Sequence, residues 1–191
     1  VPELALTGLE LQPAYAALAR RNAQANAIPA RILEGDLGQM PPDLRGESFD
    51  HVIANPPYFV GGTVAPDSGR GTARHEDTPL NDWINAGLRR LRPGAEITLI
   101  QRADRLGAIL SALGDRAGAI KILPISARAG REAGRVIVTA RKGARTPLRL
   151  LSPFILHANP SHSADGEDLT KAAQAVLREG ASLASAAPDF R

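Results

Sequence analysis

The segment FDHVIANPPY, residues 49–58, joins a short apolar run to a rigid polar corner. Its first part, up to Ala54, has the length and composition of a buried β-strand. Asn55, Pro56 and Pro57 then end that strand, because proline fixes φ and lacks a backbone N–H for a sheet or a helix. We therefore expect the carbonyl groups of this corner to be held in an extended geometry.

This corner offers two acceptors to one planar amine. The side-chain oxygen of Asn55 and the carbonyl of Pro56 can both accept hydrogen bonds from an NH2 group, while Tyr58 and Phe59 offer rings for stacking on a base. When an amine attacks, its nitrogen becomes tetrahedral, and two aligned acceptors favour that geometry over the planar ground state. A turn that merely ends a strand explains neither the Asn nor the rings. We predict Asn55, Pro56, Pro57 and Tyr58 to be the catalytic residues.

Apolar strands and helices with helical spacing of apolar residues alternate along the rest of the chain. The expected strands are 5–11, 30–37, 49–58, 95–101, 119–126 and 134–142, and the expected helices are 13–26, 79–91 and 102–116. The last two strands could form an antiparallel hairpin. The tail offers one more possible strand at 148–158 and a helix at about 167–179. This alternation predicts an α/β fold with a parallel sheet, helices on both faces and a ligand crevice at the carboxyl ends of the strands.

Two acidic residues stand at those strand ends. Glu10 is placed to accept both hydroxyls of a ribose, since a carboxylate has two acceptor oxygens, but an exposed Glu can also simply end a strand. Asp36, after Gly35, could accept a hydrogen bond from the exocyclic amine of adenine or could cap the turn that follows it. Neither acid decides the function alone.

The composition limits the classes of partner. The chain has 191 residues, 23 Lys and Arg against 20 Asp and Glu, no cysteine, and four histidines without helical ligand spacing, so we expect no metal. No apolar run approaches the roughly 20 residues that a membrane span requires. With no secretory signal, a cytoplasmic location is expected. The net charge of +3 suits a partner that carries phosphates, although charge alone is weak support.

The motif Asn55-Pro56-Pro57-Tyr58 resembles the [DNS]-P-P-[YFW] motif of class I S-adenosylmethionine-dependent methyltransferases that modify an exocyclic amine. The stretches TGLELQPAYAALARRNAQAN and EGDL look like the second strand, the following helix and the adenine-side acid of that family. ARHE (73–76) and RAGREAGRVIVTARKG (128–143) are similar to the bacterial tRNA1(Val) adenine-N6 methyltransferase group. The resemblance covers almost all of the chain up to about Asn159.

The resemblance implies a Rossmann-like class I sheet, S-adenosylmethionine as cofactor and an RNA substrate, most simply a tRNA. The cofactor-binding residues that it implies are Glu10, Leu11, Gly35, Asp36, Leu37 and Asn55. The substrate-binding residues are Tyr58, Phe59, Arg74, His75, Arg128, Arg131 and Arg135. The arginines, with Arg70, lie in two loops where their guanidinium groups match phosphate geometry, whereas a solvated loop is the simpler alternative.

This chain departs in one respect from the family, whose strand order is 3-2-1-4-5-7-6. The family's first strand and glycine-rich loop have no counterpart before Glu10, so we expect strands 3-2 to be separated from 4-5-7-6, with two apolar edges between them. We also expect a methyltransferase domain over 1–159, with 160–191 as a C-terminal loop and helix of the same domain or an appendage. The oligomeric state is not predicted.

Four functions are compatible with these residues. Methylation of the N6 amine of adenine in RNA is the leading hypothesis. A protein glutamine-N5 methyltransferase would present a similar NH2 group to the same corner, but a peptide substrate gives no reason for the basic RAGREAGR segment at 128–135. The other two alternatives are a guanine-N2 methyltransferase that acts on rRNA and a catalytically silent RNA-binding protein.

Overall fold

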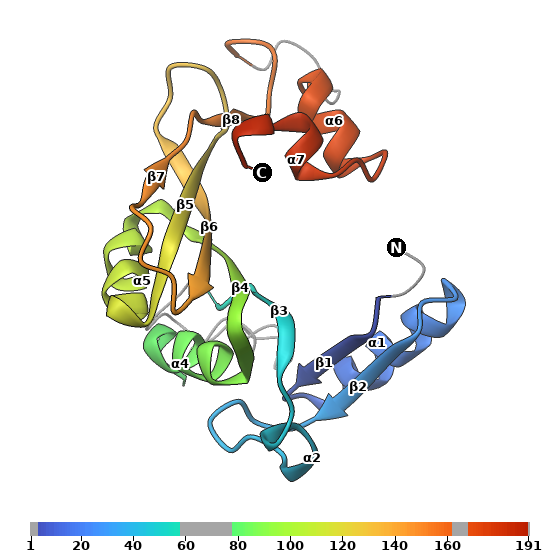
Figure 1. Cartoon of the computed structure of the whole chain (residues 1–191). Helices are drawn as coiled ribbons and strands as arrows, with labels where there is room; N and C mark the ends of the chain where they lie inside the picture. Colours follow the sequence, from blue (N-terminus) through green and yellow to red (C-terminus); the bar gives the residue numbers. More distant parts are fainter. Residues whose placement is uncertain (1–3, 58–77, 162–167, 191) are drawn as a thin grey trace, which may run out of the picture. The chain divides into compact units, whose positions relative to one another are not determined.

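The computed structural model describes residues 4–57, 78–161 and 168–190. The chain divides into two compact units, Val1–Ser48 and Phe49–Arg191. The first unit carries the elements β1 to α2, and the second carries β3 to the C-terminus (Figure 1). The division falls just before the strand that ends in the proline pair, whereas the sequence-based boundary at 159/160 stays a prediction.

The first unit is a parallel strand pair with its crossover helix. Its elements are β1 (Leu6–Glu10), α1 (Pro13–Ala25), β2 (Ala30–Glu34) and the short α2 (Pro42–Arg45). β1 and β2 run parallel, from the pair Leu6 and Ala30 to the pair Glu10 and Glu34. Pro13 begins α1, where the missing N–H costs no helical hydrogen bond. Both strands therefore end at the same edge of this small sheet.

The second unit contains the larger sheet. Its strands are β3 (Phe49–Ala54), β4 (Leu91–Arg102), β5 (Ala117–Ser126), β6 (Ala133–Lys142), β7 (Arg149–Leu150) and β8 (Phe154–Ile155). Its helices are α4 (Leu80–Arg90), α5 (Leu106–Leu113), α6 (Lys171–Leu177) and α7 (Leu183–Ala186), with single 3-10 turns at Ala103–Arg105, Gly114–Arg116 and Pro188–Phe190.

The strand order in this sheet is β3-β4-β6-β5-β7, with β8 also paired to β5. β3 and β4 are parallel, while β6 lies antiparallel between β4 and β5. The expected hairpin at 119–126 and 134–142 is therefore confirmed. Because β5 is antiparallel to β6, it runs in the same direction as β4, and the carboxyl ends of β3, β4 and β5 share one edge.

The two sheets reproduce the expected order with its expected interruption. In the family numbering, β2 and β1 correspond to strands 3 and 2, and β3, β4, β6 and β5 correspond to strands 4, 5, 7 and 6. The neighbours within each sheet are those of the family order, and the family's central strand 1 has no counterpart among the described strands. In the part of the chain that the structure describes, β1 pairs only with β2, and β3 pairs only with β4. Large apolar side chains stay exposed on both strands, Leu6 at 41% and Ile53 at 78%.

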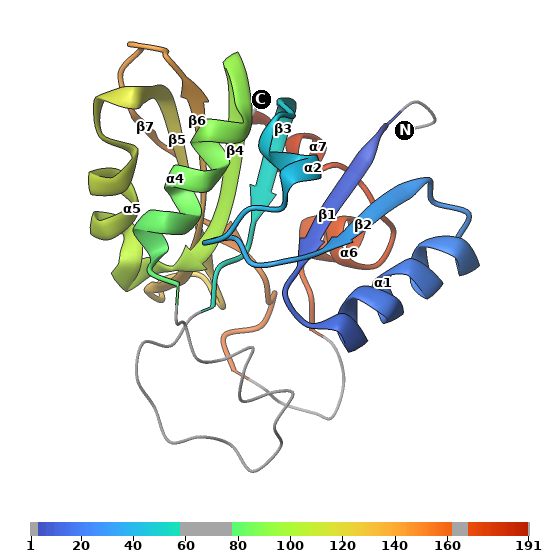
Figure 2. The same ribbon diagram turned by 90° about the horizontal axis from the view of Figure 1, so that it is seen from below.

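One face of the larger sheet carries the main core. Helices α4 and α5 pack side by side against it (Figures 1 and 2). Period-two alternation places one set of strand residues on this face, and Ile97, Leu99 and Val138 are at most 1% exposed there. Ile84 of α4 and Ile109 of α5 are fully buried against them. This core holds β4 rigidly beside the end of β3.

The C-terminal region forms a second, smaller cluster. Leu123 of β5, Leu151, Phe154 and Ala173 of α6 are its buried members. The expected strand at 148–158 is wrong as one element, because Ser152 and Pro153 interrupt it and leave β7 and β8. The expected helix at 167–179 is shorter, since the Thr170 side chain accepts a hydrogen bond from the Ala173 N–H and begins it there. Helices α2 and α7 were not expected.

Thr139 of β6 carries a structural cost in this sheet. It is 2% exposed, and its Oγ1 is one of the buried polar atoms without a hydrogen-bond partner among the described residues. An unsatisfied buried hydroxyl costs roughly 1–3 kcal/mol. Thr139→Val should therefore raise the free energy of unfolding by about 1 kcal/mol, measured by urea denaturation.

The matched control is Thr98→Val on β4, which removes the same hydroxyl from the cross-strand partner of Thr139. Thr98 Oγ1 lies 2.8 Å from His51 Nε2, so this change should not stabilise the protein. Equal effects of the two variants would contradict the assignment of the cost to the unpaired hydroxyl.

Candidate functional site

The corner Asn55-Pro56-Pro57 follows the carboxyl end of β3, as expected. Ala54 pairs with Leu99 of β4, after which Asn55 is exposed, Pro56 is fully buried and Pro57 is half-buried. The burial of Pro56 anchors the corner in the protein, while Asn55 lies at the surface. The exposed Asn55 side chain is correspondingly accessible to a ligand from outside.

A residue that the sequence did not single out fixes this corner. Gln101, near the end of β4, is 1% exposed, and its Nε2 donates to the carbonyl oxygens of Pro56 at 3.2 Å and Pro57 at 3.3 Å. Its Oε1 accepts a hydrogen bond from the Arg102 N–H at 2.8 Å. The sequence carries no local signal for this pairing, because Gln101 lies more than 40 residues from the proline pair.

Glu10 and Asp36 lie at the shared carboxyl edge of β1 and β2 in the first unit. Glu10 Oε1 accepts from the Gln12 N–H at 2.8 Å, and Asp36 Oδ1 accepts from the Gly38 N–H at 2.7 Å. Both acids therefore stabilise their own turns, which is the simpler alternative at each position. Each of these hydrogen bonds uses one of the two oxygens of its carboxylate.

Three further predicted cofactor residues, Leu11, Gly35 and Leu37, adjoin these acids in the sequence. Leu11 is 58% exposed, whereas Leu37 and Gly35 are half-buried. A Cβ at Gly35 would lie 2.4 Å from Cγ of Pro41, so the local packing alone requires glycine there. The Gly35 N–H also donates to the Glu10 carbonyl at 3.0 Å, which ties the two strand ends together. A ligand is thus not needed to explain this glycine.

The three arginines of the β5–β6 region have different surroundings. Arg128 pairs with Asp168 at 2.7 Å and also donates to the carbonyl of Asn159, and its side chain is only 14% exposed. Arg131 and Arg135 are exposed. Arg128 is therefore a weaker candidate for phosphate contact than the exposed Arg131, because the guanidinium of Arg128 already holds the C-terminal segment in place.

The Arg128–Asp168 pair extends to a histidine. Asp168 Oδ1 lies 2.6 Å from His157 Nδ1, and the Asp168 side chain is 11% exposed. The hydrogen bond from Arg128 is the main cause that lowers the pKa of the Asp168 carboxyl; burial acts in the opposite direction, and the bond with His157 adds to the lowering. The network joins residues on both sides of β8 and orders the edge of the sheet beyond β5.

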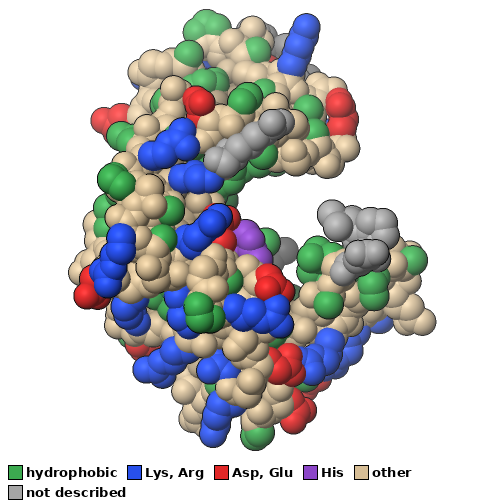
Figure 3. Space-filling model, in the orientation of Figure 1, with side chains coloured by type: hydrophobic (Ala, Val, Ile, Leu, Met, Phe, Trp, Pro, Cys, Tyr) green, Lys and Arg blue, Asp and Glu red, His purple; other side chains and the backbone are tan. Residues whose placement is uncertain are grey.

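Four predicted substrate residues, Tyr58, Phe59, Arg74 and His75, lie outside the described residues. On the face drawn in Figure 3, Lys and Arg side chains of the second unit are interspersed with Asp and Glu rather than gathered in one field. On this face, the candidates for phosphate contact are therefore single arginines of the β5–β6 loop and not a broad basic surface.

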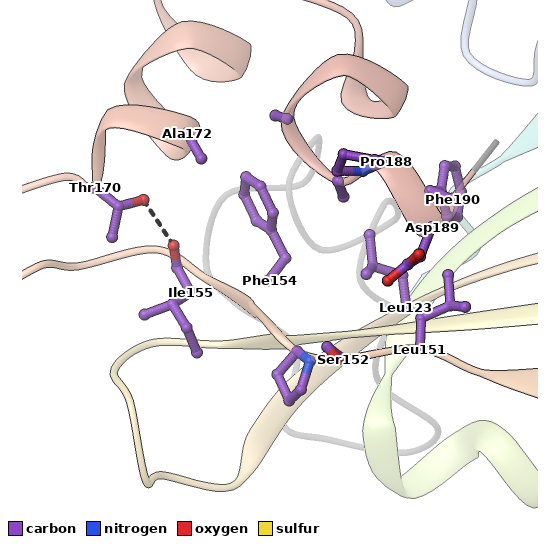
Figure 4. Close-up of a pocket in the computed structure, with 13 residues that line it drawn as sticks. Leu123, Leu151, Ser152, Phe154, Ile155, Thr170, Ala172, Pro188, Asp189 and Phe190 are labelled. Atoms are coloured by element: carbon purple, nitrogen blue, oxygen red, sulfur yellow. Dashed lines mark hydrogen bonds between the residues drawn. The ribbon is translucent and has the colours of Figure 1, made fainter.

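A cavity of about 330 Å³ lies under the C-terminal helices. Its lining is mainly apolar and includes Leu123, Leu151, Phe154 and Phe190, and the Thr170 hydroxyl beside it donates to the Ile155 carbonyl (Figure 4). The residues that line it do not include the proline corner. This cavity is therefore separate from the proline corner.

Among the residues that the structure describes, no group of three or more His, Asp or Glu side chains is arranged to hold a metal ion. Within the same residues, every helix is too short or too polar to cross a membrane.

Comparison with solved structures identifies the fold. A predicted O-methyltransferase from Agrobacterium tumefaciens matches 92% of this chain and 78% of its own, with a TM-score of 0.71 and 28% identity. A putative class I S-adenosylmethionine-dependent methyltransferase from Listeria monocytogenes matches 77% of this chain and 49% of its own, with a TM-score of 0.53 and 16% identity. The chain has the α/β fold of the class I methyltransferases.

Curated relatives show which group of methyltransferases the chain resembles. Proteins named tRNA1(Val) (adenine(37)-N6)-methyltransferase match from Porphyromonas gingivalis (36% identity, 55% of this chain, 43% of the relative), Shewanella loihica (28%, 88% and 68%) and Aeromonas hydrophila (30%, 72% and 58%). The resemblance to this group, inferred from the sequence, is confirmed. The chain spans less than half of the Porphyromonas relative. No family model matches the chain.

The Asp168 network gives a testable pH dependence. The lowered pKa of the Asp168 carboxyl means that the folded state binds this proton less readily than the unfolded state. Its stabilising contribution is therefore complete above the unfolded aspartate pKa of about 3.9 and is lost as the pH falls through the lower folded pKa. Asp168→Asn should lower the midpoint of urea unfolding at pH 5, and the difference from wild type should shrink by pH 3.

Asp104→Asn is the matched control. Arg102 likewise lowers the pKa of the Asp104 carboxyl, but the Asp104 side chain is 56% exposed, and solvent screens such pairs. This variant should leave the urea midpoint nearly unchanged at both pH values. A difference for Asp168→Asn that stays constant from pH 5 to pH 3 would show that its charge contributes nothing.

Proposed function

We propose that the protein catalyses transfer of a methyl group from S-adenosylmethionine to the exocyclic N6 amine of an adenine in RNA, with tRNA as the substrate. The observation that carries this proposal is the Asn55-Pro56-Pro57 corner at the carboxyl end of β3, where Gln101 holds the proline carbonyls. The names of the curated relatives support the choice of adenine and of tRNA.

The corner favours the tetrahedral amine. Asn55 Oδ1 and the Pro56 carbonyl accept one hydrogen bond each from the two amine hydrogens, which leaves the nitrogen lone pair directed at the methyl carbon. Formation of the new N–C bond would release the electron pair of the methyl–sulfur bond to the sulfur of the cofactor. The nitrogen, now positively charged, loses a proton to solvent and needs no dedicated base. The residues of this chain thus contribute acceptors and orientation.

The residues of the first unit fit the cofactor in part. S-adenosylmethionine, when bound, supplies an activated methyl group on a sulfonium. Glu10 would accept hydrogen bonds from the ribose hydroxyls, and Asp36 would accept one from the adenine amine, each with the carboxylate oxygen that its own turn does not use. Leu11, 58% exposed, would supply an apolar contact for the base.

The number of acceptors argues for an amine rather than a hydroxyl. A hydroxyl has one proton and needs one acceptor, whereas the corner aligns two. The similarity to the predicted O-methyltransferase from Agrobacterium tumefaciens therefore supports the fold of this chain, and we do not take the substrate of this chain from it. A protein glutamine amide would fit the acceptors as well as adenine does, but the exposed arginines Arg131 and Arg135 favour a substrate that carries phosphates.

The central test is mass spectrometry of nucleosides from tRNA that has been incubated with the full-length protein and labelled S-adenosylmethionine. Asn55→Ala should lower turnover by about 100-fold at saturating cofactor, as expected for loss of one positioned transition-state hydrogen bond. The control is Asn159→Ala, a change at an exposed residue outside the corner. Absence of N6-methyladenosine with the wild-type protein refutes the substrate, and unchanged turnover of Asn55→Ala removes this residue from the mechanism.

The arginines of the β5–β6 loop give an independent test of the RNA substrate. Arg131→Ala should weaken tRNA binding and lower the slope of log K against log salt by about one, because one phosphate contact is lost. Arg128→Ala should instead reduce stability, since its guanidinium is bound to Asp168 and to the Asn159 carbonyl. Filter binding at several salt concentrations separates the two, and an unchanged slope for Arg131→Ala removes that contact.

A further inference from the structure

Gln101 is one of three buried polar residues in the described part of the chain, together with Ser126 and Thr139. Its three hydrogen bonds use both amide protons and the amide oxygen. The orientation of the amide is determined by its partners, because two carbonyl oxygens need donors and the Arg102 N–H needs an acceptor. A flipped amide would place oxygen against oxygen. The side chain is therefore held in one arrangement by the strand end on which it lies.

The proline pair fixes only part of the corner. Pro56 restricts Asn55 to an extended conformation, and Pro57 restricts Pro56 in the same way, because a proline disfavours the helical region for the residue before it. The residue after Pro57 is Tyr58, so no following proline restricts the ψ angle of Pro57. The orientation of the Pro57 carbonyl must come from outside the segment, and Gln101 Nε2 at 3.3 Å supplies it.

We propose that Gln101 is a positioning residue for methyl transfer, an inference that rests on the proposed function. Its hydrogen bond to the Pro56 carbonyl occupies one of the two lone pairs of that oxygen and directs the other toward the incoming amine. Its bond to the Pro57 carbonyl prevents rotation of the peptide plane that follows. The residue does not contact the substrate and acts through the acceptor geometry of Pro56.

Two variants separate the donors of Gln101 from its acceptor. Gln101→Glu keeps an oxygen for the Arg102 N–H but turns a carboxylate toward the two proline carbonyls, which repels them. Gln101→Met keeps the length of the side chain and removes all three bonds. Because a displacement of about 1 Å can cost as much as 100-fold in rate, we expect both variants to lower the single-turnover rate constant by at least about 10-fold.

The measurement is single turnover of tRNA by the full-length protein at saturating S-adenosylmethionine, normalised to the cofactor-binding stoichiometry from calorimetry. The affinities for cofactor and tRNA should stay within about two-fold of wild type, since Gln101 contacts neither. Thr139→Val is the control, because it changes another buried polar residue of the same sheet that lies outside the corner. It should retain the wild-type rate constant.

The outcomes are distinguishable. If the wild-type protein forms no N6-methyladenosine, the proposed function fails and this inference fails with it. If the wild type is active and the normalised rate constant of either Gln101 variant equals that of wild type, the inference fails alone. A loss of rate that is matched by a loss of cofactor-binding stoichiometry also overturns it, because Gln101 would then serve only to keep the protein folded.

Discussion

The absence of two backbone N–H groups at the end of β3 is the constraint on which the candidate site depends. Pro56 and Pro57 cannot donate to a sheet ladder or a helix, so the strand must end there and its carbonyls need donors from elsewhere. Pro56 is also fully buried, and a buried carbonyl without a donor is unfavourable. The amide of Gln101 meets that need from the neighbouring parallel strand. The same bonds that satisfy the backbone also orient the acceptors.

The parallel pairing of β3 and β4 makes this arrangement possible. Ala54 lies opposite Leu99, so the residues that follow both strands emerge at one edge and Gln101 reaches the corner. β4 is held in turn by the core beneath α4 and α5 and by β6 on its other side. The proposed methyl transfer needs a rigid strand end, because preorganised acceptors require no rearrangement during the reaction. The fold thus contributes orientation to the chemistry.

Local pattern predicted most of the fold and the corner. The alternation of apolar strands with helices was sufficient for β1 to β6 and for α1, α4 and α5, since these elements show their own periodicity, but not for the short α2. The last expected strand is split at Ser152 and Pro153, with β7 paired to β5 before them and β8 paired to β5 after them. The role of Gln101 was not predictable, because its partners are more than 40 residues away in sequence.

The arginines of the β5–β6 loop show that a basic segment in a sequence does not reveal which of its side chains are structural. Arg128 and Arg131 are three residues apart in the same loop, and the sequence offers no means to separate them. Arg128 is 14% exposed beside Asp168, which is 11% exposed, so removing either partner would leave a poorly solvated charge. An exposed arginine such as Arg131 stays solvated and can present its guanidinium to a phosphate. The distant residue Asp168, rather than the local motif, therefore separates the paired Arg128 from the exposed Arg131.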